Sequence, residues 1–110
     1  MERVAGDPEF LATMVKIFAA DAPTRLDAIR AGLADADPRG VEQAAHSLKG
    51  ALATMAADAA AAEALRLEQL GRSGSLTGAR EILAALEHQV EAVTRALEAM
   101  VDAATPDDAA

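Results

Sequence analysis

Apolar residues recur at three- and four-residue spacing along almost the whole chain, and this spacing constrains the fold more than any other feature. On a helix such residues share one face, whereas strand residues alternate every second position. No run of β-branched residues alternates with polar ones, so no strand is predicted. Only two of the 110 residues are aromatic, and alanine supplies much of the 52% hydrophobic fraction, which favours packed helices.

Aspartate, proline and glycine divide this pattern into predicted helices. An Asp-Pro pair is typical of a helix start, because aspartate caps the first N–H groups and proline fits the first helical position. Such pairs occur at Asp7-Pro8 and Asp37-Pro38, and Asp21-Ala22-Pro23 marks a further boundary. Asp58 is a predicted cap, and Gly71 is a predicted helix stop that opens a turn. The predicted helices cover residues 8–20, the segment from 23 to about 34, 38–57, 58–70 and 76–101.

The predicted fold class is all-α: an antiparallel up-and-down four-helix bundle with one additional N-terminal helix. The helix over residues 8–20 is the additional element, either as a fifth member or as a cap across one end. We expect the bundle to span residues 7–102. Residues 1–6 are then an N-terminal remnant or linker, and residues 103–110 are a disordered tail.

Charge and cysteine content narrow the function classes. Ten Lys and Arg against eighteen Asp and Glu give a net charge of −8, which argues against nucleic acid and anionic membrane surfaces as partners. The chain has no cysteine, so disulfides and thiolate metal sites are excluded. No apolar run approaches about 18 residues and no signal-peptide pattern is present, so we expect a cytoplasmic protein.

His46 is the candidate functional residue, and it lies on the helix predicted over 38–57. Lys49 and Gly50 follow at three and four residues, so all three share one helix face. The apolar residues of the same segment cluster on roughly the opposite side: Val41, Ala44, Leu48, Leu52 and Met55. We therefore expect the helix to bury its leucines and to expose His46, with a cation and a gap beside it.

Four further residues share the face of His46 and form a predicted docking rim. They are Arg39, Glu42, Gln43 and Ala53. Ser47 is interpreted as ordinary surface. The second histidine, His88, lies away from the apolar stripe of its helix and has no Lys-Gly pair after it, so it is interpreted as a solvated side chain.

The segment His46-Ser47-Leu48-Lys49-Gly50, in an alanine-rich helix that begins at an Asp-Pro pair, resembles the histidine-containing phosphotransfer (HPt) domain of two-component phosphorelays. The resemblance extends to Asp7-Pro8-Glu9-Phe10-Leu11 and to Leu67-Glu68, and it covers about residues 7–100. It departs at Ala56, where many relatives have a glycine. From Ala56 we expect that the helix does not break where it does in many relatives.

The resemblance implies a phosphorelay carrier. His46 would accept a phosphoryl group from an aspartyl phosphate of a response-regulator receiver domain and pass it to another receiver, and a hybrid histidine kinase is a further expected partner. The chain has no evident metal-ligand cluster and no glycine-rich phosphate loop, so we expect no cofactor and no kinase or hydrolase site of its own. The Mg²⁺ that phosphoryl transfer needs is expected on the receiver.

Each site residue then has an expected role. An imidazole titrates near neutral pH, so a nucleophilic ring nitrogen is available on His46. The resemblance places a Gln or Glu opposite this histidine, and Glu68 would accept from Nδ1–H and leave Nε2 to attack. Lys49 would offset phosphoryl charge, and Gly50 would leave room for the partner. The alternatives are that Glu68 and Lys49 are ordinary solvated residues and that Gly50 permits a close helix–helix contact.

Three other functions remain open at this point. The first is an inert helical interaction module, which explains the periodicity but not the grouping of His46, Lys49 and Gly50. The second is the phospho-accepting domain of a chemotaxis-type histidine kinase, whose donor uses ATP. A metalloenzyme is the third, although two distant histidines without cysteine leave no ligand set.

The first residues of the chain bear on its origin. Met1-Glu2-Arg3-Val4 resembles the end of a short helix that precedes Asp-Pro-Glu in relatives fused behind a hybrid kinase. We therefore expect either an excised C-terminal domain or a small free-standing carrier.

Overall fold

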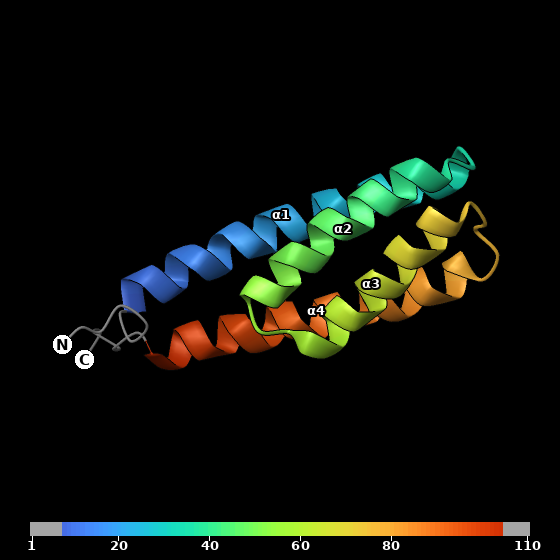
Figure 1. Cartoon of the computed structure of the whole chain (residues 1–110). Helices are drawn as coiled ribbons and strands as arrows, with labels where there is room; N and C mark the ends of the chain where they lie inside the picture. The colour runs from blue at the N-terminus through green and yellow to red at the C-terminus, as the bar shows by residue number, and fades with distance from the viewer. Residues whose placement is uncertain (1–7, 105–110) are drawn as a thin grey trace.

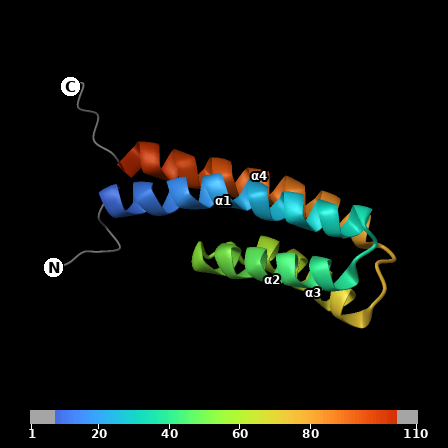
Figure 2. The same ribbon diagram turned by 90° about the horizontal axis from the view of Figure 1, so that it is seen from above.

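Four antiparallel helices form an up-and-down bundle in the computed structural model, which describes residues 8–104 (Figure 1). The helices are α1 (Pro8–Ala34), α2 (Pro38–Thr54), α3 (Asp58–Ser73) and α4 (Ala79–Ala104), and this part of the chain contains no strand. Helix α1 packs against α2 and α4, and α3 packs against the same two helices. Helices α1 and α4 extend side by side beyond α2 and α3 at one end (Figures 1 and 2). The all-α prediction is confirmed.

The predicted additional helix over residues 8–20 is wrong as a separate element. Helix α1 runs without interruption from Pro8 to Ala34 and contains Pro23 in its interior. Pro23 is exposed on the helix surface, and the helix lacks one N–H donor at this position. Phe18 before it and Leu26 after it are both buried, so packing of a shared face holds the two halves in one helix.

Helix α2 begins as predicted but ends earlier. The Asp37 side chain accepts a hydrogen bond from the Gly40 N–H at 3.1 Å, and a proline occupies the first helical turn. The helix ends at Thr54, three residues before the predicted boundary. The expectation from Ala56 is wrong: this alanine adopts a left-handed conformation with φ of 58° and ends the helix. The Ala57 N–H donates a hydrogen bond of 2.9 Å to the Leu52 carbonyl oxygen, which completes the turn.

Helix α3 starts and stops at residues other than those predicted. Ala57 is its N-cap and Asp58 is the first helical residue, so Asp58 does not cap the helix with its side chain. The helix continues through Gly71 to Ser73, and Gly74 ends it in a left-handed conformation with φ of 85°. A Cβ on Gly71 would lie 2.5 Å from the Pro38 carbonyl oxygen. Gly71 therefore permits close contact with α2 and does not stop the helix.

Helix α4 is displaced by about one turn from its predicted bounds. It begins at Ala79 and ends at Ala104, so the first two residues of the predicted tail are helical. The predicted linker over residues 1–6 and the rest of the predicted tail lie outside the described residues. None of the described helices is long and apolar enough to cross a membrane.

One hydrophobic cluster of leucine, isoleucine, valine, phenylalanine and alanine side chains fills the bundle. Its largest fully buried side chains are Ile29, Leu48, Leu52, Leu67, Leu86 and Val41. Burial of each such leucine or isoleucine contributes about 1.5–3 kcal/mol. Three of these residues belong to α2, so the core orients that helix and determines which of its faces meets solvent.

The turn between α2 and α3 generates a stability prediction. A left-handed conformation costs a non-glycine residue about 1–2 kcal/mol, and glycine adopts it freely. We expect Ala56→Gly to raise the free energy of unfolding by about 1 kcal/mol, measured by urea denaturation followed by circular dichroism. Ala62→Gly, in the exposed interior of α3, is the control and should lower stability by about 1 kcal/mol. A loss of stability in Ala56→Gly would contradict the observed turn.

Candidate functional site

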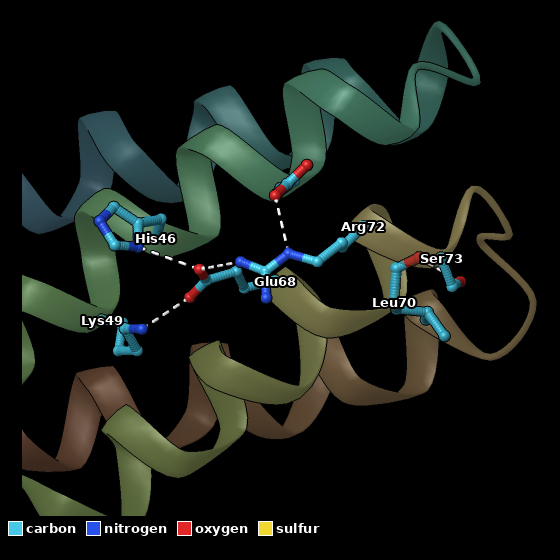
Figure 3. Close-up of polar contacts among 7 residues, drawn as sticks. His46, Lys49, Glu68, Leu70, Arg72 and Ser73 are labelled. Atoms are coloured by element: carbon cyan, nitrogen blue, oxygen red, sulfur yellow. Dashed lines mark hydrogen bonds and ion pairs between the residues drawn. The ribbon is translucent and has the colours of Figure 1, made fainter.

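His46 lies on the outward face of α2, near the middle of the helix (Figure 3). Leu48 and Leu52 of the same helix are fully buried, and 66% of the His46 side-chain surface is exposed. This is the arrangement that the periodicity of the segment predicts. The imidazole is therefore open to a large partner while its helix is fixed by the core.

Glu68 reaches His46 from the neighbouring helix α3. Only 5% of the Glu68 side-chain surface is exposed, and its Oε2 lies 3.0 Å from His46 Nδ1 (Figure 3). A carboxylate oxygen accepts hydrogen bonds, so Nδ1 donates the proton. When the ring is neutral, Nε2 then holds the free lone pair. The structure thus contains the contact that the resemblance implies, and the role of Glu68 in transfer stays a prediction.

Lys49 forms an ion pair with the second oxygen of the same carboxylate. Its Nζ lies 2.8 Å from Glu68 Oε1, and 30% of its side-chain surface is exposed. Lys49 is the largest cause that lowers the pKa of Glu68; burial opposes it, and the contact with His46 lowers the pKa further. Glu68 is therefore held as a carboxylate.

Arg72 completes this polar cluster and was not predicted as a site residue. Its Nη2 lies 2.9 Å from Glu68 Oε2, and its Nε lies 3.1 Å from Glu42 Oε2 on α2 (Figure 3). The four-residue spacing from Glu68 to Arg72 is a sequence signal for a helical ion pair. That spacing does not reveal the second contact, which depends on how α2 and α3 pack.

A surface hollow lies beside His46 between α2 and α3. It is lined by Arg39, Glu42, Gln43, His46, Ser47, Glu68 and Arg72. Three residues of the predicted docking rim therefore lie around one hollow with the histidine, whereas the exposed Ala53 does not line it. Ser47, interpreted from the sequence as ordinary surface, belongs to the lining. The docking role of this rim stays a prediction.

Gly50 lies on the exposed side of α2, one turn after His46. A Cβ built at this position would have no heavy atom within 4 Å, apart from its own helix backbone and chain neighbours. Among the described residues, no close helix–helix contact requires this glycine. The alternative explanation of Gly50 as a packing residue is therefore wrong, and the space beside His46 is open.

Two further observations concern groups outside the cluster. Within residues 8–104, no group of three or more His, Cys, Asp and Glu side chains is placed to hold a metal ion. His88 lies exposed on α4 and does not line the hollow beside His46. Of the two histidines, His46 is therefore the one that lies in the polar cluster with Glu68.

A family model of the Hpt domain matches residues 13–104. The chain belongs to the Hpt domain family. Hpt domains carry phosphoryl groups in two-component signalling and interact with receiver domains in phosphorelays. Comparisons with curated proteins and with solved structures found no significant match.

The lowered pKa of Glu68 predicts a pH-dependent contribution to stability. The ordinary value for glutamate is 4.5, and the folded value lies below it, so ionised Glu68 stabilises the fold above the unfolded-state pKa. This contribution is lost as the pH falls through the folded-state pKa. We expect Glu68→Gln to lower the free energy of unfolding by about 1–3 kcal/mol at neutral pH and by less under acidic conditions.

Urea unfolding of wild type and of Glu68→Gln, at pH 7 and below pH 4, measures the difference in their free energies of unfolding. Glu91→Gln is the control, because Glu91 pairs with Arg95 on the exposed surface of α4. Such a pair contributes about 0.5 kcal/mol or less. A difference between wild type and Glu68→Gln that stays constant with pH would contradict the assigned ionisation.

Proposed function

We propose that this protein is a phosphorelay carrier whose His46 accepts a phosphoryl group from a receiver aspartyl phosphate and passes it to another receiver. The observation that carries this proposal is the pairing of an exposed imidazole with a buried carboxylate. Glu68 holds Nδ1–H at 3.0 Å, while most of the His46 ring remains open to a partner. Membership of the Hpt family supports the same chemistry.

The transfer forms one bond and breaks one bond. The Nε2 lone pair of His46 attacks phosphorus, the Nε2–P bond forms, and the P–O bond to the receiver aspartate breaks with both electrons on the aspartate oxygen. The proton stays on Nδ1, so the phosphorylated ring carries a positive charge that the Glu68 carboxylate stabilises. In the onward transfer, an aspartate oxygen of the second receiver attacks phosphorus, and the Nε2–P bond breaks with both electrons on Nε2 of His46.

Charge around the moving group comes from both proteins. Lys49 supplies a cation on the face of His46, one helical turn away, and offsets phosphoryl charge. We propose that the carrier has no cofactor of its own and that Mg²⁺ on the receiver supplies the remaining charge stabilisation. A hybrid histidine kinase is a proposed upstream partner, and the exchange takes place in the cytoplasm.

A transfer assay tests the proposal directly. Phosphorylated receiver domains are mixed with wild type, His46→Gln and His88→Gln, and the acid-labile, base-stable label on the carrier is followed. We expect label on wild type and on His88→Gln and none on His46→Gln, because only His46 combines exposure with a held Nδ1–H. His88 is the matched control, since it is an exposed helical histidine of the same chain.

Other outcomes would replace the proposal. Label obtained only with ATP and a chemotaxis-type kinase would make the protein the phospho-accepting domain of such a kinase. No label under either condition would leave a helical interaction module.

The open space at Gly50 predicts opposite effects on stability and on transfer. Glutamine is a better helix former than glycine by roughly 0.5–1 kcal/mol, and no neighbour obstructs it here. We expect Gly50→Gln to raise the free energy of unfolding by that amount. If Arg39, Glu42, Gln43 and Ala53 surround the docked receiver, the new side chain raises the receiver concentration for half-maximal transfer about 10-fold.

Stability is measured by urea denaturation, and transfer is measured over a range of receiver concentrations. Ala96→Gln places the same side chain on the exposed surface of α4, away from the hollow, and should leave transfer unchanged. Unchanged half-saturation in Gly50→Gln would rule out receiver docking over Gly50.

A further inference from the structure

We propose that Arg72 is a positioning residue for phosphoryl transfer and that Glu42 anchors it. The Glu42–Arg72 pair holds the Glu68 carboxylate in the orientation in which it accepts the Nδ1 proton of His46. This inference rests on the proposed function of His46 and adds to it the two residues that keep its hydrogen-bond acceptor in place.

The two carboxylate oxygens of Glu68 each contact a different cation. Lys49 lies 2.8 Å from Oε1, and Arg72 Nη2 lies 2.9 Å from Oε2, the same oxygen that accepts from His46 Nδ1 (Figure 3). Lys49 and Arg72 approach the carboxylate from opposite sides. Without Arg72, the remaining cation attracts the carboxylate toward Lys49, and Oε2 is no longer held opposite Nδ1.

Arg72 acts through Glu68 and not on the phosphoryl group. The two ring nitrogens of an imidazole point in nearly opposite directions, and Nδ1 of His46 points to Glu68 Oε2. Nε2 therefore points away from the carboxylate and from the guanidinium that shares its oxygen (Figure 3). A phosphoryl group on Nε2 lies on the far side of the ring from Arg72.

Glu42 restrains the exposed side chain of Arg72, which would otherwise be free to adopt other rotamers. The Arg72 side chain is 63% exposed, and its Nε lies 3.1 Å from Glu42 Oε2. The backbone brings the two residues together, because a Cβ on the preceding residue, Gly71, would lie 2.7 Å from the Glu42 nitrogen. The planar guanidinium bridges carboxylates on two helices at once, and an ammonium group lacks this fork of donors.

The first readout needs no partner. In protein with ¹⁵N-labelled histidine at about pH 8.5, where imidazoles are neutral, the ring ¹⁵N shifts report which nitrogen carries the proton. We expect wild type to hold the proton mainly on Nδ1 of His46. Arg72→Gln and Glu42→Gln should both shift the population toward the Nε2–H form. The Nε2–H population of Arg72→Lys should lie between those of these two variants and of wild type. Lysine keeps the positive charge but cannot contact Glu42 and Glu68 at the same time.

The second readout is transfer from a phosphorylated receiver. We expect Arg72→Gln to slow transfer at saturating receiver about 10-fold, since small displacements of a reacting group cost rate steeply, and to leave the half-saturating concentration unchanged. Glu42→Gln should slow saturating transfer less strongly, and because Glu42 also belongs to the predicted docking rim, its half-saturating concentration is not used as a test. Arg66→Gln is the matched control, because Arg66 is an exposed arginine of α3 that pairs with Glu63. It should change neither readout.

Two results would overturn the inference. One is an unchanged tautomer population in Arg72→Gln and Glu42→Gln together with a raised half-saturating concentration in Arg72→Gln, which would make Arg72 a docking contact. The other is an unchanged tautomer population with unchanged transfer. Failure of the proposed function is a separate result, because wild-type protein would then take up no label at His46 whatever the variants show.

Discussion

A carboxylate buried between two helices must find positive or hydrogen-bonding partners, and the site depends on this requirement. Glu68 is the only charged residue among the buried residues of the described chain. An unpaired buried charge costs several kcal/mol, so the interface between α2 and α3 tolerates Glu68 because Lys49, His46 and Arg72 surround it. The partners that satisfy the buried charge are the same ones that orient the imidazole.

Close backbone packing brings these partners within reach. Gly71 lets α3 approach the first turn of α2 so closely that a Cβ would lie 2.5 Å from the Pro38 carbonyl oxygen. The same turn also contacts α1, where a Cβ on Gly32 would lie 2.8 Å from a methyl group of Val41. The first turn of α2 is thus closely packed against both α1 and α3. This packing determines where the following residues of α2, including Glu42 and His46, lie relative to α3.

Features that depend on one helix alone were predicted well from the sequence. The Asp37-Pro38 start of α2 and the exposed face of His46 follow from capping chemistry and from a 3.6-residue period, and both are observed. The contact of Glu68 with His46 was expected from family resemblance, since spacing within one helix cannot supply it.

Features that depend on tertiary packing were predicted poorly. Pro23 was interpreted as a helix boundary and Gly71 as a helix stop, and packing against neighbouring helices overrides both local signals. Ala56 shows the reverse, because the turn imposes a left-handed conformation on a residue that favours helix. Arg72 was missed because its link to Glu42 exists only once α2 and α3 are in contact.

The unequal lengths of the helices have a practical consequence for attaching other molecules to this protein. Helices α1 and α4 extend side by side past the turn between α2 and α3, so Pro8 and Ala104 lie at the same end of the bundle (Figure 2). Gly32 packs against Val41 in the antiparallel pair of α1 and α2, which places His46 beside the residues about 20 positions after Pro8. At 1.5 Å per residue, this separation is about 30 Å along the bundle. A dye, a surface tether or a fused domain joined at this end would leave the histidine face free for a partner.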